Sequence, residues 1–126
     1  IMHNICIDQK PFSLTLDDLG VFAGRENIRV LWLGLAGDIN RLTSLYNKIE
    51  EGLNSLGFPR EKRGYKPHVT IGQDIVFKED FLHIRDGLSL GKFTTIYVDR
   101  LFLFKSEQIG NKRIYTKISR YPLLGK

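Results

Sequence analysis

The stretch Tyr65–Gly72 constrains the fold most, because polar and apolar side chains alternate within it with a period of two. Such alternation predicts a β-strand, with Val69 and Ile71 on one face and His68 and Thr70 on the other. We expect Val69 and Ile71 to be buried behind the strand. His68 and Thr70 are then expected to project from a rigid element into a polar concavity.

An imidazole and a hydroxyl about 7 Å apart on one strand face fit phosphate chemistry. The imidazole can give or take a proton near neutral pH, and the hydroxyl can donate to a phosphoryl oxygen. However, a histidine in a strand is more often a surface residue with one hydrogen-bond partner, and threonine is simply a good strand former. The His-x-Thr pattern alone leaves both interpretations open.

Composition narrows the class of protein. The hydrophobic fraction of 42% and the charged fraction of 26% are ordinary for a globular chain of 126 residues. No apolar run reaches the length of a membrane span, so no membrane partner is expected. The single Cys6 excludes an internal disulfide, offers no zinc spacing and favours a reducing, cytoplasmic setting. A net charge of +5 favours anionic partners such as RNA without requiring them.

Hydrophobic periodicity and turn residues predict the other elements. The expected elements are a helix end at 1–8, strands at 12–16 and 28–35, an irregular connection at 17–24, a helix from an Asp38 N-cap to Gly57, a second helix at 78–90, a strand at 93–105 that bends near Asp99-Arg100, a turn at 110–112 and a strand at 113–119. The apolar run at 28–35 is typical of a central strand buried on both faces. This order predicts one α+β domain, residues 1–126, with a mainly antiparallel sheet and helices packed on one side.

A basic segment leads into the His68 strand, at residues 58–66. It is either a solvated loop or an electropositive approach to the site, and the sequence leaves both open. Its chemistry-bearing residues are Arg60, Lys62, Arg63, Tyr65 and Lys66.

With these elements in place, the chain resembles the RNA 2′,3′-cyclic phosphodiesterases, also called 2′-5′ RNA ligases, of the two-histidine (2H) phosphoesterase superfamily. The most specific part is Pro-His-Val-Thr-Ile-Gly at 67–72. The resemblance also covers residues 12–22, residues 29–35, the leucine-rich helix ending in Gly57-Phe58, residues 101–106 and Tyr115. It implies the C-terminal portion of a two-lobed fold in which each lobe gives one His-x-Thr strand to a central cleft.

Only one such motif occurs in this sequence. His3 is followed by Asn-Ile and His83 by Ile-Arg, so neither qualifies. The Ser-Leu-Thr-Leu run at 13–16 matches a later strand of the family and is not a degenerate first motif. We therefore expect the first motif to lie upstream of Ile1 and the chain to be a fragment. Gln73 stands where relatives often carry a basic residue, which leaves Arg63 or Lys66 as candidate phosphate ligands.

The resemblance implies that a terminal 2′,3′-cyclic phosphate of RNA is opened to a 2′-phosphate between two histidines. One histidine would take a proton from water, and the other would protonate the leaving ribose oxygen. His68 and Thr70 would be catalytic, while Arg63, Lys66 and Tyr65 would bind substrate. No metal and no cofactor is implied. The same chemistry run backwards with an RNA 5′-hydroxyl would make a 2′-5′ linkage.

Two alternatives come from other classes of function. A degenerate relative could bind RNA ends without turning them over, using the basic residues of 58–66 with Tyr65 as a stacking surface. A purely structural fragment could instead present apolar faces that expect a missing lobe. Which proton-transfer role His68 takes, and the oligomeric state, do not follow from the sequence.

Overall fold

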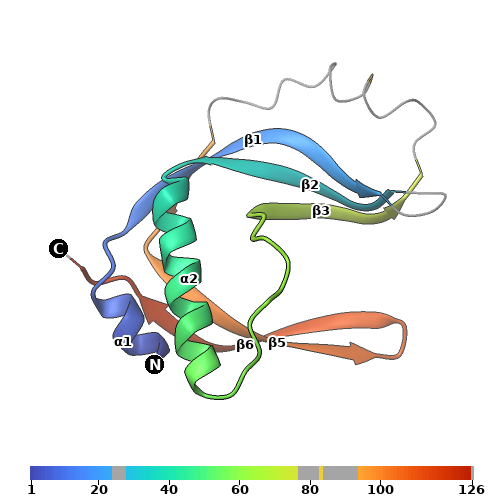
Figure 1. Ribbon diagram of the computed structural model, residues 1–126. Coiled ribbons are helices and arrows are strands. Elements are labelled where there is room, and N and C mark those ends of the chain that lie inside the picture. Colours follow the sequence, from blue (N-terminus) through green and yellow to red (C-terminus); the bar gives the residue numbers. More distant parts are fainter. Residues whose placement is uncertain (24–27, 77–82, 84–93, 126) are drawn as a thin grey trace. The chain divides into compact units, whose positions relative to one another are not determined.

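The computed structural model describes residues 1–23, 28–76, 83 and 94–125 (Figure 1). The elements in chain order are α1 (Met2–Ile7), β1 (Phe12–Ala23), β2 (Ile28–Gly37), α2 (Ile39–Ser55), β3 (His68–Ile75), β4 (Thr95–Val98), β5 (Arg100–Ile109) and β6 (Lys112–Pro122). One sheet has the strand order β3-β2-β1-β4, and a second sheet pairs β5 with β6. Neighbouring strands β1 and β2, β2 and β3, and β5 and β6 all pair antiparallel. The predicted α+β class with a mainly antiparallel sheet is confirmed.

The chain forms two compact units. The helix-hairpin unit comprises Ile1–Phe12, Asn40–Lys62 and Tyr97–Lys126, and the sheet unit comprises Ser13–Ile39 and Arg63–Ile96. No helix in the described ranges is both long enough and apolar enough to cross a membrane.

The helix-hairpin unit has a small apolar core made by Cys6, Phe12, Leu45 and Leu123, each at most 4% exposed. Burial raises the pKa of the Cys6 thiol, so the group packs as a neutral side chain. The chain's last residues are tied to the end of α1, because the Leu124 amide donates to the Cys6 carbonyl at 3.3 Å. The expected helix at the start of the chain is confirmed.

The end of α2 follows from a glycine signal. Gly57 has φ of +97°, a left-handed conformation that side chains disfavour. The Phe58 amide donates to the Leu53 carbonyl at 3.2 Å, and the Gly57 amide donates to the Asn54 carbonyl at 3.0 Å. This pair of bonds is the Schellman motif, which satisfies carbonyls that the helix itself leaves open. The predicted helix end at Gly57 is confirmed.

Asp38 precedes the first residue of α2, as predicted for an N-cap, but it also holds the sheet. Its carboxylate accepts from the Ser13 amide at 3.1 Å, and its own amide donates to the Ser13 carbonyl at 3.0 Å. The residue therefore ties the start of β1 to the end of β2.

The expected irregular connection at 17–24 is wrong for residues 17–23, because β1 continues to Ala23. Pairing with β2 shifts between Leu16 and Leu19, so that Asp17 and Asp18 form a bulge opposite Gly34. A bulge lets two acidic residues enter a strand without ending it. The alternation resumes beyond the bulge, which the short pattern Phe12–Leu16 did not reveal.

β2 lies between β1 and β3, which confirms a central strand. Burial on both faces is wrong, since Val30 alone is buried in β2 and most of its neighbours are half-exposed. Further along, the predicted bend near Asp99 is a break between two strands, β4 and β5, which belong to different sheets. The helix predicted at 78–90 lies outside the described residues, apart from His83.

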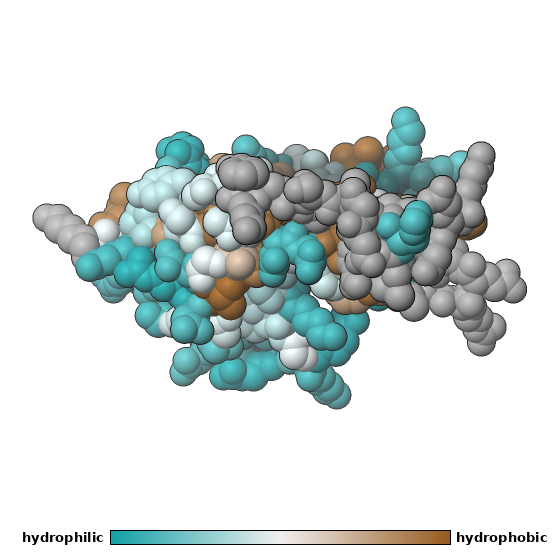
Figure 2. Space-filling view, turned by 90° about the horizontal axis from the view of Figure 1, so that it is seen from above, coloured by the Kyte–Doolittle hydropathy of each residue, from teal (hydrophilic) through white to brown (hydrophobic). Residues whose placement is uncertain are grey.

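The terminal hairpin matches its prediction closely. β5 and β6 are joined at Gly110-Asn111, and Gly110 has φ of +60°. Positive φ at a two-residue turn matches the right-handed twist of the flanking strands. On the face seen in Figure 2, brown apolar patches lie among teal hydrophilic ones, and many large apolar side chains are exposed.

Candidate active site on β3

Strand β3 sits at the edge of the four-stranded sheet and begins at His68. Its register with β2 pairs His68 with Gly34 and Thr70 with Trp32. Directly paired residues of an antiparallel sheet share a face, so His68, Thr70 and Trp32 lie on one side of it. The predicted strand and the shared face of His68 and Thr70 are confirmed.

The His68 ring rests on two aromatic side chains from the neighbouring strands. Its centroid lies 5.3 Å from that of Phe22 in an edge-to-face arrangement, and 6.3 Å from that of Trp32. The Phe22 and Trp32 centroids are 5.5 Å apart. We call Phe22 and Trp32 the aromatic floor. Edge-to-face contacts of this kind contribute about 0.5–1.5 kcal/mol each and favour one ring orientation.

A backbone hydrogen bond fixes the proton on the His68 ring. Nδ1 lies 2.6 Å from the Lys66 carbonyl oxygen. A carbonyl accepts only, so Nδ1 carries the hydrogen and donates it. In the neutral ring Nε2 then holds the lone pair, and in the charged ring Nε2 holds the second proton. Nε2 is therefore the ring nitrogen of this exposed side chain that the backbone leaves open.

The aromatic floor is possible because Gly20 lies beneath the indole. Gly20 pairs directly with Trp32, and a Cβ placed on Gly20 would clash with the Trp32 ring. The buried indole N–H has no hydrogen-bond partner within the described part of the chain. Packing, rather than a hydrogen bond, therefore holds Trp32 in place.

We expect Gly20→Ala to displace Trp32 and to lower the free energy of unfolding by about 1–3 kcal/mol, the usual cost of overpacking. Trp32 is the sole tryptophan, so its fluorescence emission reports the displacement directly. Gly64→Ala is the matched control, because a Cβ there meets nothing within 4 Å. Unchanged emission and an unchanged denaturant midpoint in Gly20→Ala would contradict the packing described above.

The expected burial of Val69 and Ile71 is wrong. Val69 is 38% exposed and Ile71 is 51% exposed. The register places Val69 opposite Leu33 on the face away from His68, as predicted. At Ile71 the pairing skips one residue between Trp32 and Leu31, so a bulge interrupts β3 directly after Thr70. An edge strand has a neighbour on one side only, and both side chains keep much of their surface in solvent.

The residues of the basic segment 58–66 fall in both units. Arg63, Tyr65 and Lys66 belong to the sheet unit and are exposed, while Arg60 and Lys62 of the same basic segment belong to the helix-hairpin unit. Lys66 contacts His68 through its backbone carbonyl, which accepts the hydrogen bond from Nδ1. The expectation that His68 and Thr70 face a polar concavity stays a prediction.

Sequence reasoning missed two neighbours of His68 and one cation beside its aromatic floor. Phe22 and Trp32 form its floor, and the Arg29 guanidinium lies 5.8 Å from the Phe22 ring centroid. Arg29 is exposed and brings a positive charge to the edge of the aromatic floor. The register of β1, β2 and β3 reveals these neighbours, and that register is not readable from any one strand. Among the described residues, no group of three or more His, Cys, Asp or Glu could hold a metal ion.

Comparison with known proteins identifies the family. Residues 2–108 match the family model described as the 2′-5′ RNA ligase superfamily, and the chain belongs to this family of 2H phosphoesterases. The resemblance to this family of enzymes, inferred from the sequence, is thereby confirmed. That the chain is the C-terminal portion of a longer fold stays a prediction.

Several curated relatives are named RNA 2′,3′-cyclic phosphodiesterase. That of Methanocaldococcus jannaschii is 31% identical over 94% of this chain and 68% of its own length. That of Aquifex aeolicus is 36% identical over 91% of this chain and 62% of its own. That of Geobacillus stearothermophilus is 30% identical over 98% of this chain, which spans only 39% of that relative.

Solved structures agree on the fold. The crystal structure of E. coli LigT complexed with 3′-AMP superposes with a TM-score of 0.72 at 26% identity, over 97% of this chain and 66% of that one. TT0787 of Thermus thermophilus gives a TM-score of 0.68 at 20% identity, over 98% of this chain and 67% of that one, and supports the fold alone.

Proposed function

We propose that the protein carrying this chain opens the terminal 2′,3′-cyclic phosphate of RNA to a 2′-phosphate. His68 transfers the proton through Nε2, and the Thr70 hydroxyl donates to a non-bridging phosphoryl oxygen. The observation that carries this proposal is the hydrogen bond from His68 Nδ1 to the Lys66 carbonyl, because it commits Nε2 to proton exchange. The names of the curated relatives support the substrate class.

The aromatic floor supports the same role. It holds the His68 ring from beneath while leaving the residue exposed, so the proton carrier is oriented without being sealed off. Orientation of this kind lets a single imidazole act at a fixed point on a bound phosphate. In this proposal Arg63, Lys66 and Tyr65 contact the substrate, and Arg29 joins them as a source of positive charge.

In-line displacement at phosphorus needs a base and an acid at the same time. His68 is the sole histidine of this sequence in a His-x-Thr motif, so we propose that the second proton carrier lies outside these 126 residues, upstream of Ile1. The single cysteine, Cys6, is a buried free thiol, and free thiols are typical of proteins in a reducing compartment. We therefore include a cytoplasmic location in the proposal.

The experiment is a turnover assay on a dinucleotide with a 2′,3′-cyclic phosphate, followed by phosphorus NMR. We expect a 2′-phosphate as the product, because the 3′ oxygen is the leaving group. A 3′-phosphate, or no product at any enzyme concentration, would contradict the proposal. Adding a metal chelator is expected to leave the rate unchanged.

RNA-end binding without turnover is the second candidate, favoured by the exposed basic segment 58–66. We expect Arg60→Ala, Lys62→Ala and Arg63→Ala together to weaken RNA binding and to lower the slope of log K against log salt by up to about 2, at roughly 0.7 for each phosphate contact. Fluorescence anisotropy between low and high salt measures both quantities. An unchanged slope would show that the segment is a solvated loop.

A further inference from the structure

The β5–β6 hairpin carries the net charge of the whole chain. Residues 100–122 contain six basic side chains against one acidic side chain, a net of +5, which equals the net charge of all 126 residues. The rest of the chain is therefore neutral on balance. A positive field concentrated on one hairpin attracts an anionic partner to that hairpin.

This charge stands beside exposed aromatic rings on one face of the hairpin. Register pairs Phe102 with Arg120 and Phe104 with Lys117, and Phe102 and Phe104 alternate onto the same side. Their ring centroids are 6.2 Å apart, and the two residues are 38% and 48% exposed. The Lys117 ammonium lies 4.1 Å from the Phe102 centroid. We call Arg100, Phe102, Phe104, Lys117 and Arg120 the hairpin face.

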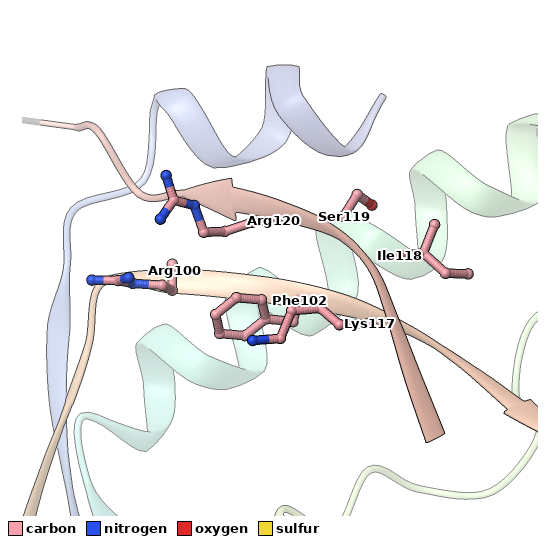
Figure 3. Close-up of a pocket in the computed structure, with 6 residues that line it drawn as sticks. All are labelled: Arg100, Phe102, Lys117, Ile118, Ser119 and Arg120. Carbon is pink, nitrogen blue, oxygen red and sulfur yellow. The ribbon is translucent and has the colours of Figure 1, made fainter. Parts of the chain in front are cut away.

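An open concavity of about 480 Å³ lies on this face, lined by Arg100, Phe102, Lys117, Ile118, Ser119 and Arg120. In Figure 3, Arg100 and Arg120 extend from neighbouring strands on one side of the Phe102 ring, and Lys117 lies beside the ring. The volume falls in the range of small-ligand sites, about 300–1,000 Å³. An aromatic ring with cations around it can stack a base and contact the adjoining phosphates.

One acidic residue, Asp99, reduces the positive charge that the hairpin face offers to a ligand. Arg100 donates to both carboxylate oxygens of Asp99, at 2.8 and 2.9 Å. The Arg100 hydrogen bond holds the pKa of Asp99 below its ordinary value, and the Arg120 charge acts in the same direction. Arg120 and Lys117 therefore supply most of the available positive charge, while Arg100 is shared with Asp99.

We propose that the hairpin face binds single-stranded RNA, with a base stacked on Phe102 and phosphates held by Lys117 and Arg120. Exposed rings in a row favour unpaired bases, which have free faces, over an acidic peptide, which has none. The proposal rests on the proposed function for the choice of RNA as the anion.

The test measures binding without turnover. The probe is a fluorescein-labelled RNA octamer ending in a 3′-phosphate, titrated with the full-length protein at several salt concentrations. Lys117→Gln with Arg120→Gln is expected to lower affinity and to flatten the salt slope by about 1.4, at roughly 0.7 for each phosphate contact. Phe102→Leu is expected to lower affinity by about 5- to 100-fold with no change in slope.

Two further variants sharpen the result. Lys112→Gln removes one charge at the hairpin turn, outside the concavity, and is expected to change affinity by less than about twofold. Asp99→Asn releases Arg100 and is expected to raise affinity. Thermal unfolding of every variant checks that the hairpin is intact, and Phe102→Leu keeps most of the side-chain volume.

Three outcomes overturn the proposal. The first is that Phe102→Leu binds the RNA as tightly as wild type. The second is that Lys112→Gln loses as much RNA affinity as the Lys117→Gln, Arg120→Gln double variant. The third is that polyglutamate competes equally well for wild type and for Phe102→Leu. A blunt-ended RNA duplex should bind without dependence on Phe102, because its bases are already stacked. The probe is not a substrate, so the binding result can be interpreted even if the cyclic phosphodiesterase assay shows no turnover. Likewise, the turnover result can be interpreted even if the hairpin face does not bind the probe.

Discussion

His68→Ala is expected to lower turnover of a cyclic-phosphate dinucleotide by about 10²–10⁴-fold, the usual effect of losing one positioned acid or base. The reason is that Nδ1 of His68 is committed to the Lys66 carbonyl, which leaves Nε2 as the nitrogen that exchanges protons with the substrate. A protein that carries the complete site is required, since the fall is measured against a working enzyme. Rates at saturating and at low substrate separate an effect on chemistry from one on binding.

The same substitution should leave the protein folded, with a loss of at most about 1–3 kcal/mol in the free energy of unfolding. His68 is exposed, and its main packing contacts are the edge-to-face contact with Phe22 and the tilted contact with Trp32. Losing them costs about 0.5–1.5 kcal/mol each at most. His3→Ala is the matched control, because His3 is exposed in α1 and is not followed by x-Thr. Full turnover in His68→Ala, with His3→Ala also fully active, would end the two-histidine interpretation.

The second large effect concerns the 126 residues taken alone. We expect them to open a cyclic phosphate at least about 10²-fold more slowly than a longer form of the protein that contains a second His-x-Thr motif. The argument is a count of proton carriers, since the displacement needs two and this sequence places one histidine in such a motif. Both forms are assayed at equal molar concentration on the same dinucleotide.

Circular dichroism and size-exclusion chromatography on the same samples check that the shorter form is folded. Equal rates in the two forms would show that a second catalytic group exists within these 126 residues. A longer form that lacks turnover as well would instead favour the RNA-binding alternative. The two failures therefore lead to different conclusions.

Local signals in the sequence determined much of the fold. The alternation at 68–71 predicted the strand and the face shared by His68 and Thr70. Gly57 predicted the end of α2, and Gly110 lies in the predicted hairpin turn, each with positive φ in the structure. These features depend on neighbours within a few residues, so a single chain segment is enough to predict them.

The surroundings of His68 were decided only by tertiary structure. Phe22 and Trp32 reach it through the register of three strands, and a slip of one residue would move either ring to the opposite face. The exposure of Val69 and Ile71 also depends on tertiary structure. Alternation predicts on which face of the strand a side chain lies, but it does not predict which other residues cover that face. Long-range pairing sets both properties, and the bulges at Asp17–Asp18 and Ile71 adjust that pairing in ways that a period of two does not encode.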